Sequence, residues 1–123
     1  MKDLKIVLVD DSPLIRDCLN STLTRIQGCA VVGMAADGIE GVEVIRELRP
    51  HVVVLDITMP HRDGIDVLRE IRKEDPEMVI IMFTADPSVV LEDICLKEGA
   101  NYYLSKSELI DLVGICKELV AVM

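Results

Sequence analysis

Basic residues and aromatic residues are scarce in this sequence. The 123 residues include 13 lysines and arginines against 22 aspartates and glutamates, which gives a formal net charge of −9. This balance argues against direct binding to nucleic acid and suits a site that takes up cations, although solubility alone explains many of the acids. Tryptophan is absent, so the usual fluorescence probe of ligand binding is missing.

Long apolar runs are absent too. No stretch approaches the roughly 20 apolar residues of a membrane-spanning helix. Met1-Lys2-Asp3 enters a four-residue apolar strand rather than the longer apolar segment of a signal peptide. We therefore expect a soluble, cytoplasmic protein that makes no contact with a membrane.

Cysteines at metal-ligand spacing are also missing. Cys18, Cys29, Cys95 and Cys116 are widely separated, with no C-x-x-C pair and no histidine at ligand spacing. We expect four reduced cysteines that serve as small core residues in a cytosolic protein. Zinc binding and disulfide formation are the alternatives.

Two kinds of apolar segment alternate five times along the chain. Short, unbroken runs predict buried strands at 6–9, 30–35, 52–55, 79–83 and 102–104. After each strand, apolar residues at helical spacing predict a helix, and these helices end near residues 28, 50, 76, 99 and 123. This alternation predicts an α/β fold in which helices cover both faces of a parallel sheet. No linker or composition shift divides the chain, so residues 1–123 should form one domain.

Polar residues follow these strands. Asp10 and Asp11 end the first strand, Asp56 the third and Thr84 the fourth, and Lys106 follows the fifth. All should lie at one edge of a parallel sheet, where ligands bind in open α/β folds. Three close carboxylates repel each other unless a cation joins them, and Mg²⁺ suits an all-oxygen site. The lysine and hydroxyl then suggest a phosphoryl group beside the metal, although a single acid after a strand is often only a helix cap.

These residues give the sequence a specific resemblance. In order, they are the acidic pair at 10–11, LDITMPHRDG at 55–64, Thr84-Ala85, and the stretch from Gly99-Ala100 to Lys106. The sequence resembles the receiver domain of bacterial two-component response regulators over essentially its whole length, most of all receivers that precede a helix-turn-helix DNA-binding domain. The resemblance implies a flavodoxin-like, doubly wound sheet of five parallel strands in the order 2-1-3-4-5, with five helices.

The resemblance also implies roles for the acids. Asp56 would accept a phosphoryl group from the phosphohistidine of a sensor histidine kinase. Asp11, Asp56 and the backbone carbonyl of Thr58 would bind Mg²⁺ directly, while Asp10 would act largely through a bound water. The receiver would catalyse this transfer and later hydrolyse its own acyl phosphate, so it would not be a conventional turnover enzyme.

A switch is implied as well. Lys106 and the Thr84 hydroxyl would contact phosphoryl oxygens, and the space that Thr84 leaves would be filled by Tyr103. This would change the surface of the fourth helix, the fifth strand and the fifth helix. Tyr103 as an ordinary strand residue, or Tyr102 as the moving ring, are alternatives. Ser107 stands where many receivers have proline, which puts a cis peptide after Lys106 in doubt.

The expected partners are a histidine kinase and an output module. The last predicted helix is apolar on more than one face, which suits a phosphorylation-dependent homodimer, an output-domain contact or a loosely covered terminal helix. DNA would be bound only through an output domain absent from this chain.

Other functions fit less well. A protein-interaction module that works without phosphorylation would be indicated by a missing acid, threonine or lysine, and all are present. A metal-dependent phosphohydrolase would place a second acid two residues after Asp56, where Thr58 stands. The acidic loop DDSPL at 10–14 disfavours flavin binding, because a phosphate-binding loop offers Gly, Ser and Thr instead.

Overall fold

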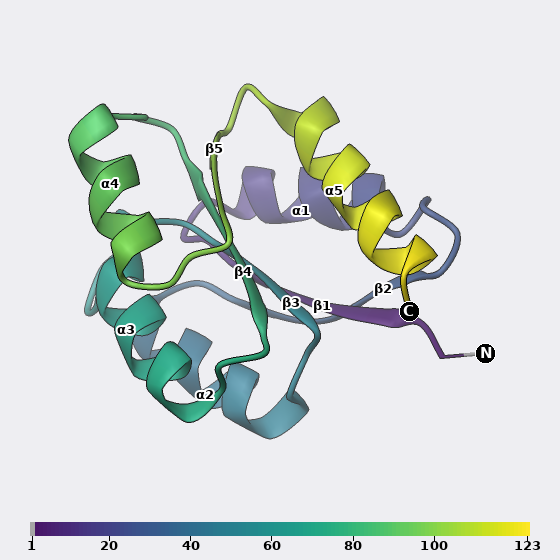
Figure 1. Cartoon of the computed structure of the whole chain (residues 1–123), viewed down its shortest axis with the longest axis horizontal. Coiled ribbons are helices and arrows are strands. Elements are labelled where there is room, and N and C mark those ends of the chain that lie inside the picture. The colour runs from purple at the N-terminus through teal and green to yellow at the C-terminus, as the bar shows by residue number, and fades with distance from the viewer. Residues whose placement is uncertain (1) are drawn as a thin grey trace.

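The computed structural model describes residues 2–123, which form a parallel sheet of five strands with helices on both faces (Figure 1). The strand order is β2-β1-β3-β4-β5, so the predicted doubly wound fold is confirmed. None of the helices in the described residues has the length and apolarity needed to cross a bilayer. The elements in chain order are β1 (Leu4–Val9), α1 (Pro13–Leu23), β2 (Cys29–Ala35), α2 (Gly38–Leu48), β3 (Val52–Leu55), α3 (Gly64–Glu74), β4 (Val79–Thr84), α4 (Val89–Lys97), β5 (Tyr102–Ser105) and α5 (Leu109–Ala121).

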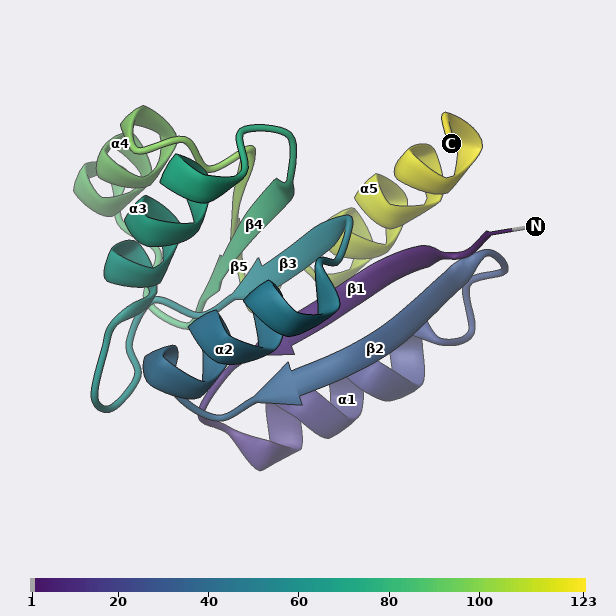
Figure 2. The ribbon, with the colours of Figure 1, turned by 90° about the horizontal axis from the view of Figure 1, so that it is seen from below.

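Two apolar cores hold the helices against the sheet. Helices α1 and α5 cover one face, and α2, α3 and α4 cover the other (Figures 1 and 2). Successive residues of a strand point to opposite faces. In the central strand β3, Val53 and Leu55 therefore join the α2–α3–α4 core, while Val52 and Val54 join the α1–α5 core. This two-sided burial explains why the β3 sequence, VVVL, is uniformly apolar.

Strand register fixes where the polar residues emerge. Val9 pairs with Leu55, so the next residues, Asp10 and Asp56, leave the sheet at the same level. The Asp56 N–H donates to the Val9 carbonyl over 2.9 Å. On the other side of β3, Leu55 pairs with Met82 of β4. The carboxyl ends of the central strands thus form one edge.

Side chains begin the helices that follow this edge. Ser12, Asp37, Asp63 and Ser88 each accept a hydrogen bond from the backbone N–H three residues later, over 2.8–3.3 Å. Such caps satisfy backbone donors that the first helical turn leaves free. They fix the loops that carry the site.

Helix α1 differs from the prediction in two ways. It ends at Leu23 rather than near residue 28, where the Thr24 hydroxyl donates to the Asn20 carbonyl over 2.6 Å and turns follow. The prediction that Cys18 is a core residue is wrong. It is exposed, because the buried stripe of α1 consists of Leu19 and Leu23 and residue 18 lies beside that stripe. The other three cysteines are buried, and all four are free.

Helix α5 uses most of its apolar surface on the sheet. Leu112 and Cys116 are fully buried, and the partly buried residues Leu109, Val113, Ile115, Leu119 and Val120 pack against the same core. Ile110 is the exception within the helix, with 87% of its surface exposed. The apolar excess noted in the sequence is therefore mostly core.

Candidate functional site

Three carboxylates meet at the carboxyl ends of β1 and β3. Carboxylate oxygens of Asp10, Asp11 and Asp56 all lie within 4.8 Å of one another. Only 4% of the Asp10 side chain and 5% of the Asp56 side chain are exposed, whereas Asp11 is open to solvent. The Ser12 N–H donates to Asp10 Oδ1 over 2.9 Å and helps to orient that acid. The cluster is thus buried at its base and accessible at Asp11.

Lys106 is the cation that reaches this cluster. Its Nζ lies 2.8 Å from Asp10 Oδ2 and 3.5 Å from Asp56 Oδ2. The Lys106 N–H donates to the Thr84 carbonyl over 2.8 Å, which places the lysine backbone beside the end of β4. In this state the ammonium group is closer to Asp10 than to the predicted phosphoacceptor.

The loop after β5 holds Lys106 without a cis peptide. No peptide bond within residues 2–123 is cis, including the one between Lys106 and Ser107. The Ser105 N–H donates to Glu108 Oε1 over 2.9 Å, and the hydroxyls of Ser105 and Ser107 are 2.9 Å apart. These hydrogen bonds order the turn in which many receivers carry proline.

Burial and repulsion together oppose ionisation of Asp56. They raise its pKa from 3.8 to about 6, with burial the largest cause, the Asp10 charge the next and Asp11 a further contribution, while Lys106 acts in the opposite direction. Burial alone would lower the pKa of Lys106, but its hydrogen bond and attraction to Asp10 and the Asp56 charge outweigh burial and raise it. One lysine therefore compensates three carboxylates only in part.

The donor set fits a hard divalent cation. It consists of carboxylate oxygens from Asp10, Asp11 and Asp56, with neither sulfur nor imidazole in the group. Mg²⁺ is commonly bound by one or two carboxylates together with several waters. Asp11 is open to solvent, which gives such waters access to the cluster. A cation here would also relieve the repulsion that raises the pKa of Asp56.

Thr84 ends β4, and Tyr103 lies in the neighbouring strand β5. Thr84 is buried at the end of β4, and its hydroxyl accepts a hydrogen bond from the Asp86 N–H over 3.2 Å. Tyr103 packs on the α2–α3–α4 side of the sheet, and its hydroxyl accepts from the N–H of Ser88, the N-cap of α4, over 3.1 Å. Tyr102 packs against the α1–α5 core on the opposite face. Only Tyr103, then, contacts the beginning of α4.

The loop after Asp56 depends on a close backbone approach. The Gly64 N–H donates to the Ile57 carbonyl over 2.7 Å, and a Cβ at position 64 would overlap the carbonyl oxygen of Asp56. The side chain of Thr58, whose carbonyl the resemblance assigns to the metal, is exposed. In the sequence, Gly64 is only the last residue of LDITMPHRDG, and its Asp-Gly context carries no signal for this contact.

Arg16 is a neighbour of the site that the sequence analysis missed. Its Nη1 donates to the main-chain carbonyl of Asp10 over 2.6 Å. This bond supports the backbone between Asp10 and Asp11. Nothing in a single arginine on an amphipathic helix predicts such a contact.

The fold and the acidic site together define a class of protein. A doubly wound parallel sheet carries an acidic, oxygen-only site between β1 and β3, where the strand order reverses and ligands bind in this fold. The chain belongs to the response regulator receiver domain family, whose match extends over residues 6–115. Receiver domains bind Mg²⁺ at an acidic pocket and interact with histidine kinases.

One curated relative is a longer response regulator, of which the match covers less than half. The probable C4-dicarboxylate response regulator DctR of Bacillus subtilis (strain 168) is 34% identical over 105 residues. The match covers 85% of this chain and 46% of DctR, so the chain spans about half the length of that relative.

Two solved structures are similar over most of the chain. A LuxR-family two-component response regulator from Aurantimonas sp. SI85-9A1 has a TM-score of 0.90 and 34% identity, covering 98% of this chain and 86% of that one. A chain of the CheX-CheY-BeF3-Mg²⁺ complex from Borrelia burgdorferi has a TM-score of 0.83 and 29% identity, covering 89% of this chain and 86% of that one.

Proposed function

We propose that this chain is a phosphoacceptor in two-component signalling, with Asp56 as the residue that is modified. The observation that carries the proposal is the buried cluster in which Asp56 lies within 4.8 Å of two further carboxylates and 3.5 Å from Lys106. A carboxylate so placed would be a nucleophile kept ionised by Lys106 together with a bound cation.

The donor would be a phosphohistidine of a sensor histidine kinase. An Asp56 carboxylate oxygen attacks phosphorus and forms an oxygen–phosphorus bond, while the bond from phosphorus to the imidazole nitrogen breaks. The nitrogen keeps the electron pair, so the donor histidine returns to its neutral form after proton exchange with water. To end the signal, a water oxygen attacks the same phosphorus and gives up a proton to solvent, while the bond from phosphorus to the Asp56 oxygen breaks. The carboxylate keeps the electron pair, and inorganic phosphate leaves.

The residues of the site would have separate roles in the transfer. Asp10, Asp11 and Asp56, with the Thr58 carbonyl, would hold Mg²⁺, which supplies charge neutralisation for the phosphoryl oxygens. Lys106 exchanges its contact with Asp10 for a phosphoryl oxygen, a short movement given that Nζ already lies between Asp10 and Asp56. Burial of Asp56 excludes competing water from its carboxylate.

The output would be transmitted through α4. The Thr84 hydroxyl turns toward the new phosphoryl group, and Tyr103 moves into the space that it vacates. The Tyr103 hydroxyl accepts a hydrogen bond from the Ser88 N–H at the beginning of α4. Movement of Tyr103 therefore breaks this hydrogen bond. A surface formed by α4, β5 and α5 is thereby biased between two states.

The controlled process would be transcription, through a further domain. The similarity to a LuxR-family regulator and the half-length match to DctR support this choice. The phosphorylated chain would also form a homodimer, which size-exclusion chromatography of both states would detect. The exposed Ile110 and the exposed valines at the beginning of α4 are available for such contacts.

The direct test is intact-mass spectrometry after incubation with Mg²⁺ and acetyl phosphate. We expect one added phosphoryl group on the parent chain and none in the presence of a chelator. Asp56→Asn should remain unmodified. Asp63→Asn is the matched control, because this acid belongs to the same loop, is exposed and keeps its helix-capping oxygen as asparagine.

Failure would take a recognisable form. If the parent chain binds Mg²⁺ yet gains no phosphoryl group, the chain is better explained as an interaction module that works without phosphorylation. A modified Asp56→Asn variant would show that another residue is the acceptor.

A further inference from the structure

The loop from Ile57 to Asp63, called the acceptor loop below, joins Asp56 to α3 in an unfavourable backbone conformation. His61 has φ +70°, in the left-handed region that residues with a Cβ rarely adopt. Such a conformation persists where the surroundings impose it. The Arg62 N–H donates to the Pro60 carbonyl over 2.8 Å and closes the loop just around His61.

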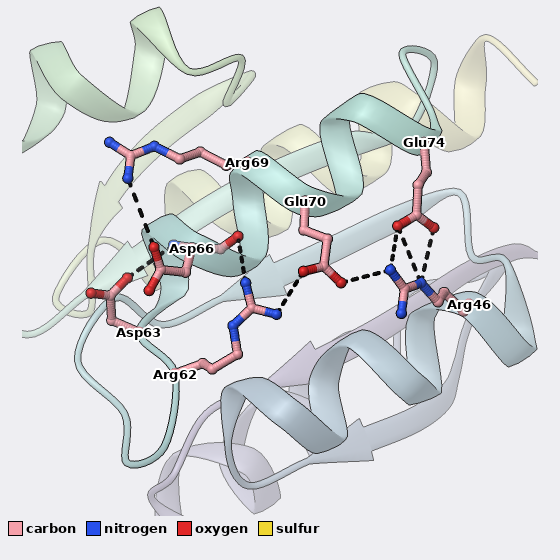
Figure 3. A network of polar contacts seen from close by, with 7 residues as sticks. All are labelled: Arg46, Arg62, Asp63, Asp66, Arg69, Glu70 and Glu74. Carbon is pink, nitrogen blue, oxygen red and sulfur yellow. Dashed lines mark hydrogen bonds and ion pairs between the residues drawn. The ribbon is translucent and has the colours of Figure 1, made fainter.

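Arg62 fixes this loop to α3 through its side chain. Its Nη1 lies 2.7 Å from Glu70 Oε1, and its Nη2 donates to the Asp66 carbonyl over 3.4 Å (Figure 3). About a third of each partner's side chain is exposed, at 32% for Arg62 and 31% for Glu70. This ion pair is therefore more shielded from solvent than the Arg46–Glu74 pair, whose side chains are 50% and 44% exposed.

Helix α2 supports the same loop in two ways, indirectly through Glu70 and directly at Gly38. The other oxygen of Glu70 accepts from Arg46 Nη2 over 2.6 Å, so the carboxylate that binds Arg62 is itself fixed by α2 (Figure 3). The first residue of α2, Gly38, approaches Arg62 so closely that a Cβ would overlap the Arg62 carbonyl oxygen. Arg62 is thus held by its backbone and by its guanidinium group.

We propose that Arg62 and Glu70 are positioning residues for the cation site, because they hold the acceptor loop that presents Thr58 next to Asp56. This inference rests on the proposed function, in which the Thr58 carbonyl is a metal ligand. The pair touches neither the metal nor the phosphoryl group. It acts by ordering the loop before the cation arrives, which lowers the conformational entropy lost on binding.

The network supplies its own control. Arg46 also binds Glu74 of α3 through two nitrogens, with Nε 2.9 Å from Glu74 Oε1. This pair connects α2 to α3 in the same way but lies at the far end of α3 from the acceptor loop (Figure 3). Glu74→Gln therefore removes a comparable surface charge without touching Arg62.

The first readout uses protein without metal. Amide hydrogen exchange, followed by NMR, should become faster at Arg62 and Gly64 in Arg62→Met and in Glu70→Gln, because these N–H groups close the loop. It should be unchanged in Glu74→Gln. Equal exchange in parent and Arg62→Met would overturn the proposal.

The second readout is the Mg²⁺ dissociation constant, measured well below the unfolding temperature. Arg62→Met should weaken binding by about two- to fivefold, the range expected for a partly exposed ion pair. Arg62→Lys should restore part of the loss, since it keeps the charge without the planar fork. Salt near 1 M should shrink the difference between parent and Arg62→Met.

The outcomes separate this inference from the function on which it rests. If the parent chain does not bind Mg²⁺, the proposed function fails, and with it the link between Arg62 and the metal; the exchange rates still decide whether the pair orders the loop. If the parent binds Mg²⁺ and Arg62→Met binds it equally well, only the positioning role is overturned.

Discussion

Two groups of opposite charges in this molecule have similar distances and different surroundings. In the first, Lys106 lies 2.8 and 3.5 Å from the carboxylates of Asp10 and Asp56 at the edge of the sheet. In the second, Arg46 and Arg62 lie 2.6 and 2.7 Å from Glu70 on the outer surface of α2 and α3. Distance alone does not distinguish them.

Burial makes the two groups behave in opposite ways. Asp10 and Asp56 at the sheet edge are almost fully buried, and burial is the largest cause of the raised pKa of Asp56, which is about 6. On the surface, the hydrogen bond from Arg62 lowers the pKa of Glu70, and that from Arg46 lowers the pKa of Glu74. The buried acid is therefore held at a cost in stability, whereas the surface acids gain a modest, screened attraction. A bound cation should therefore stabilise the buried group more than the surface group.

The largest expected effect is at Asp56. Its unfolded carboxyl has the ordinary pKa of 3.8, and the folded one about 6, so the folded state binds the proton more tightly. Stability should therefore fall as pH rises from about 4 to about 6, and the full cost of up to about 3 kcal/mol should be present above that. In a chelator at pH 8, Asp56→Asn should be more stable than the parent in urea unfolding, and the gain should disappear below about pH 4. A less stable Asp56→Asn at pH 8 would contradict this comparison.

Removing the cation from the buried group should have the next largest effect. Lys106→Met leaves three carboxylates with no ammonium group and should cost about 2 kcal/mol at pH 8, less than for a fully buried pair because 16% of the Lys106 side chain is exposed. The loss should shrink at pH 5, where Asp56 takes up a proton. A loss independent of pH would point to packing of the lysine stem instead.

Addition of Mg²⁺ should sharpen the contrast between the two groups. A ligand that binds only the folded state stabilises it by about 1.4 kcal/mol at a tenfold excess over its Kd. We expect this gain for the parent chain in thermal unfolding, and little of it for Asp11→Asn. Glu74→Gln should keep the full gain, because its carboxylate is outside the cation site.

The smallest effect should come from the surface group. Glu74→Gln should lower stability only slightly at low salt, as expected for an exposed pair with 44–50% of each side chain in solvent. Near 1 M salt the difference from the parent should vanish. A loss as large as that of Lys106→Met that persists in salt would mean that the surface pair stabilises the fold as much as the buried one.

Much of the buried group can be predicted from the sequence. The apolar runs identify the strands, and Asp10, Asp56 and Lys106 stand directly after strand segments, so parallel topology alone brings them to one edge. The position of the site depends on the order and direction of the strands, and both can be inferred from the alternation of apolar runs along the sequence.

The surface network cannot be predicted in this way. Arg46 and Glu74 are 28 positions apart, and their contact depends on the separation and rotation of two helices. Arg62 is one of several charged residues near Asp56, and only the folded loop shows that it turns toward Glu70. Likewise, the sequence does not show which of Tyr102 and Tyr103 faces α4, because this orientation depends on how β5 pairs with β4.

The predicted end of α1 was wrong for a different reason. Apolar residues continue at helical spacing past Leu23 to Ile26, so the periodicity favours a longer helix. In the structure Ile26 is buried from a turn, not from a helix. Periodicity reports which residues are buried more reliably than it reports their backbone conformation.

The most direct test of the central claim is an NMR titration of the Asp56 side-chain carboxyl carbon, with and without Mg²⁺. The account predicts a pKa of about 6 in chelator and a marked fall when Mg²⁺ is present, because the cation stabilises the ionised form. An ordinary pKa near 3.8 in chelator, or a raised pKa that Mg²⁺ leaves unchanged, would contradict the claim that this buried acidic group is built to receive a cation.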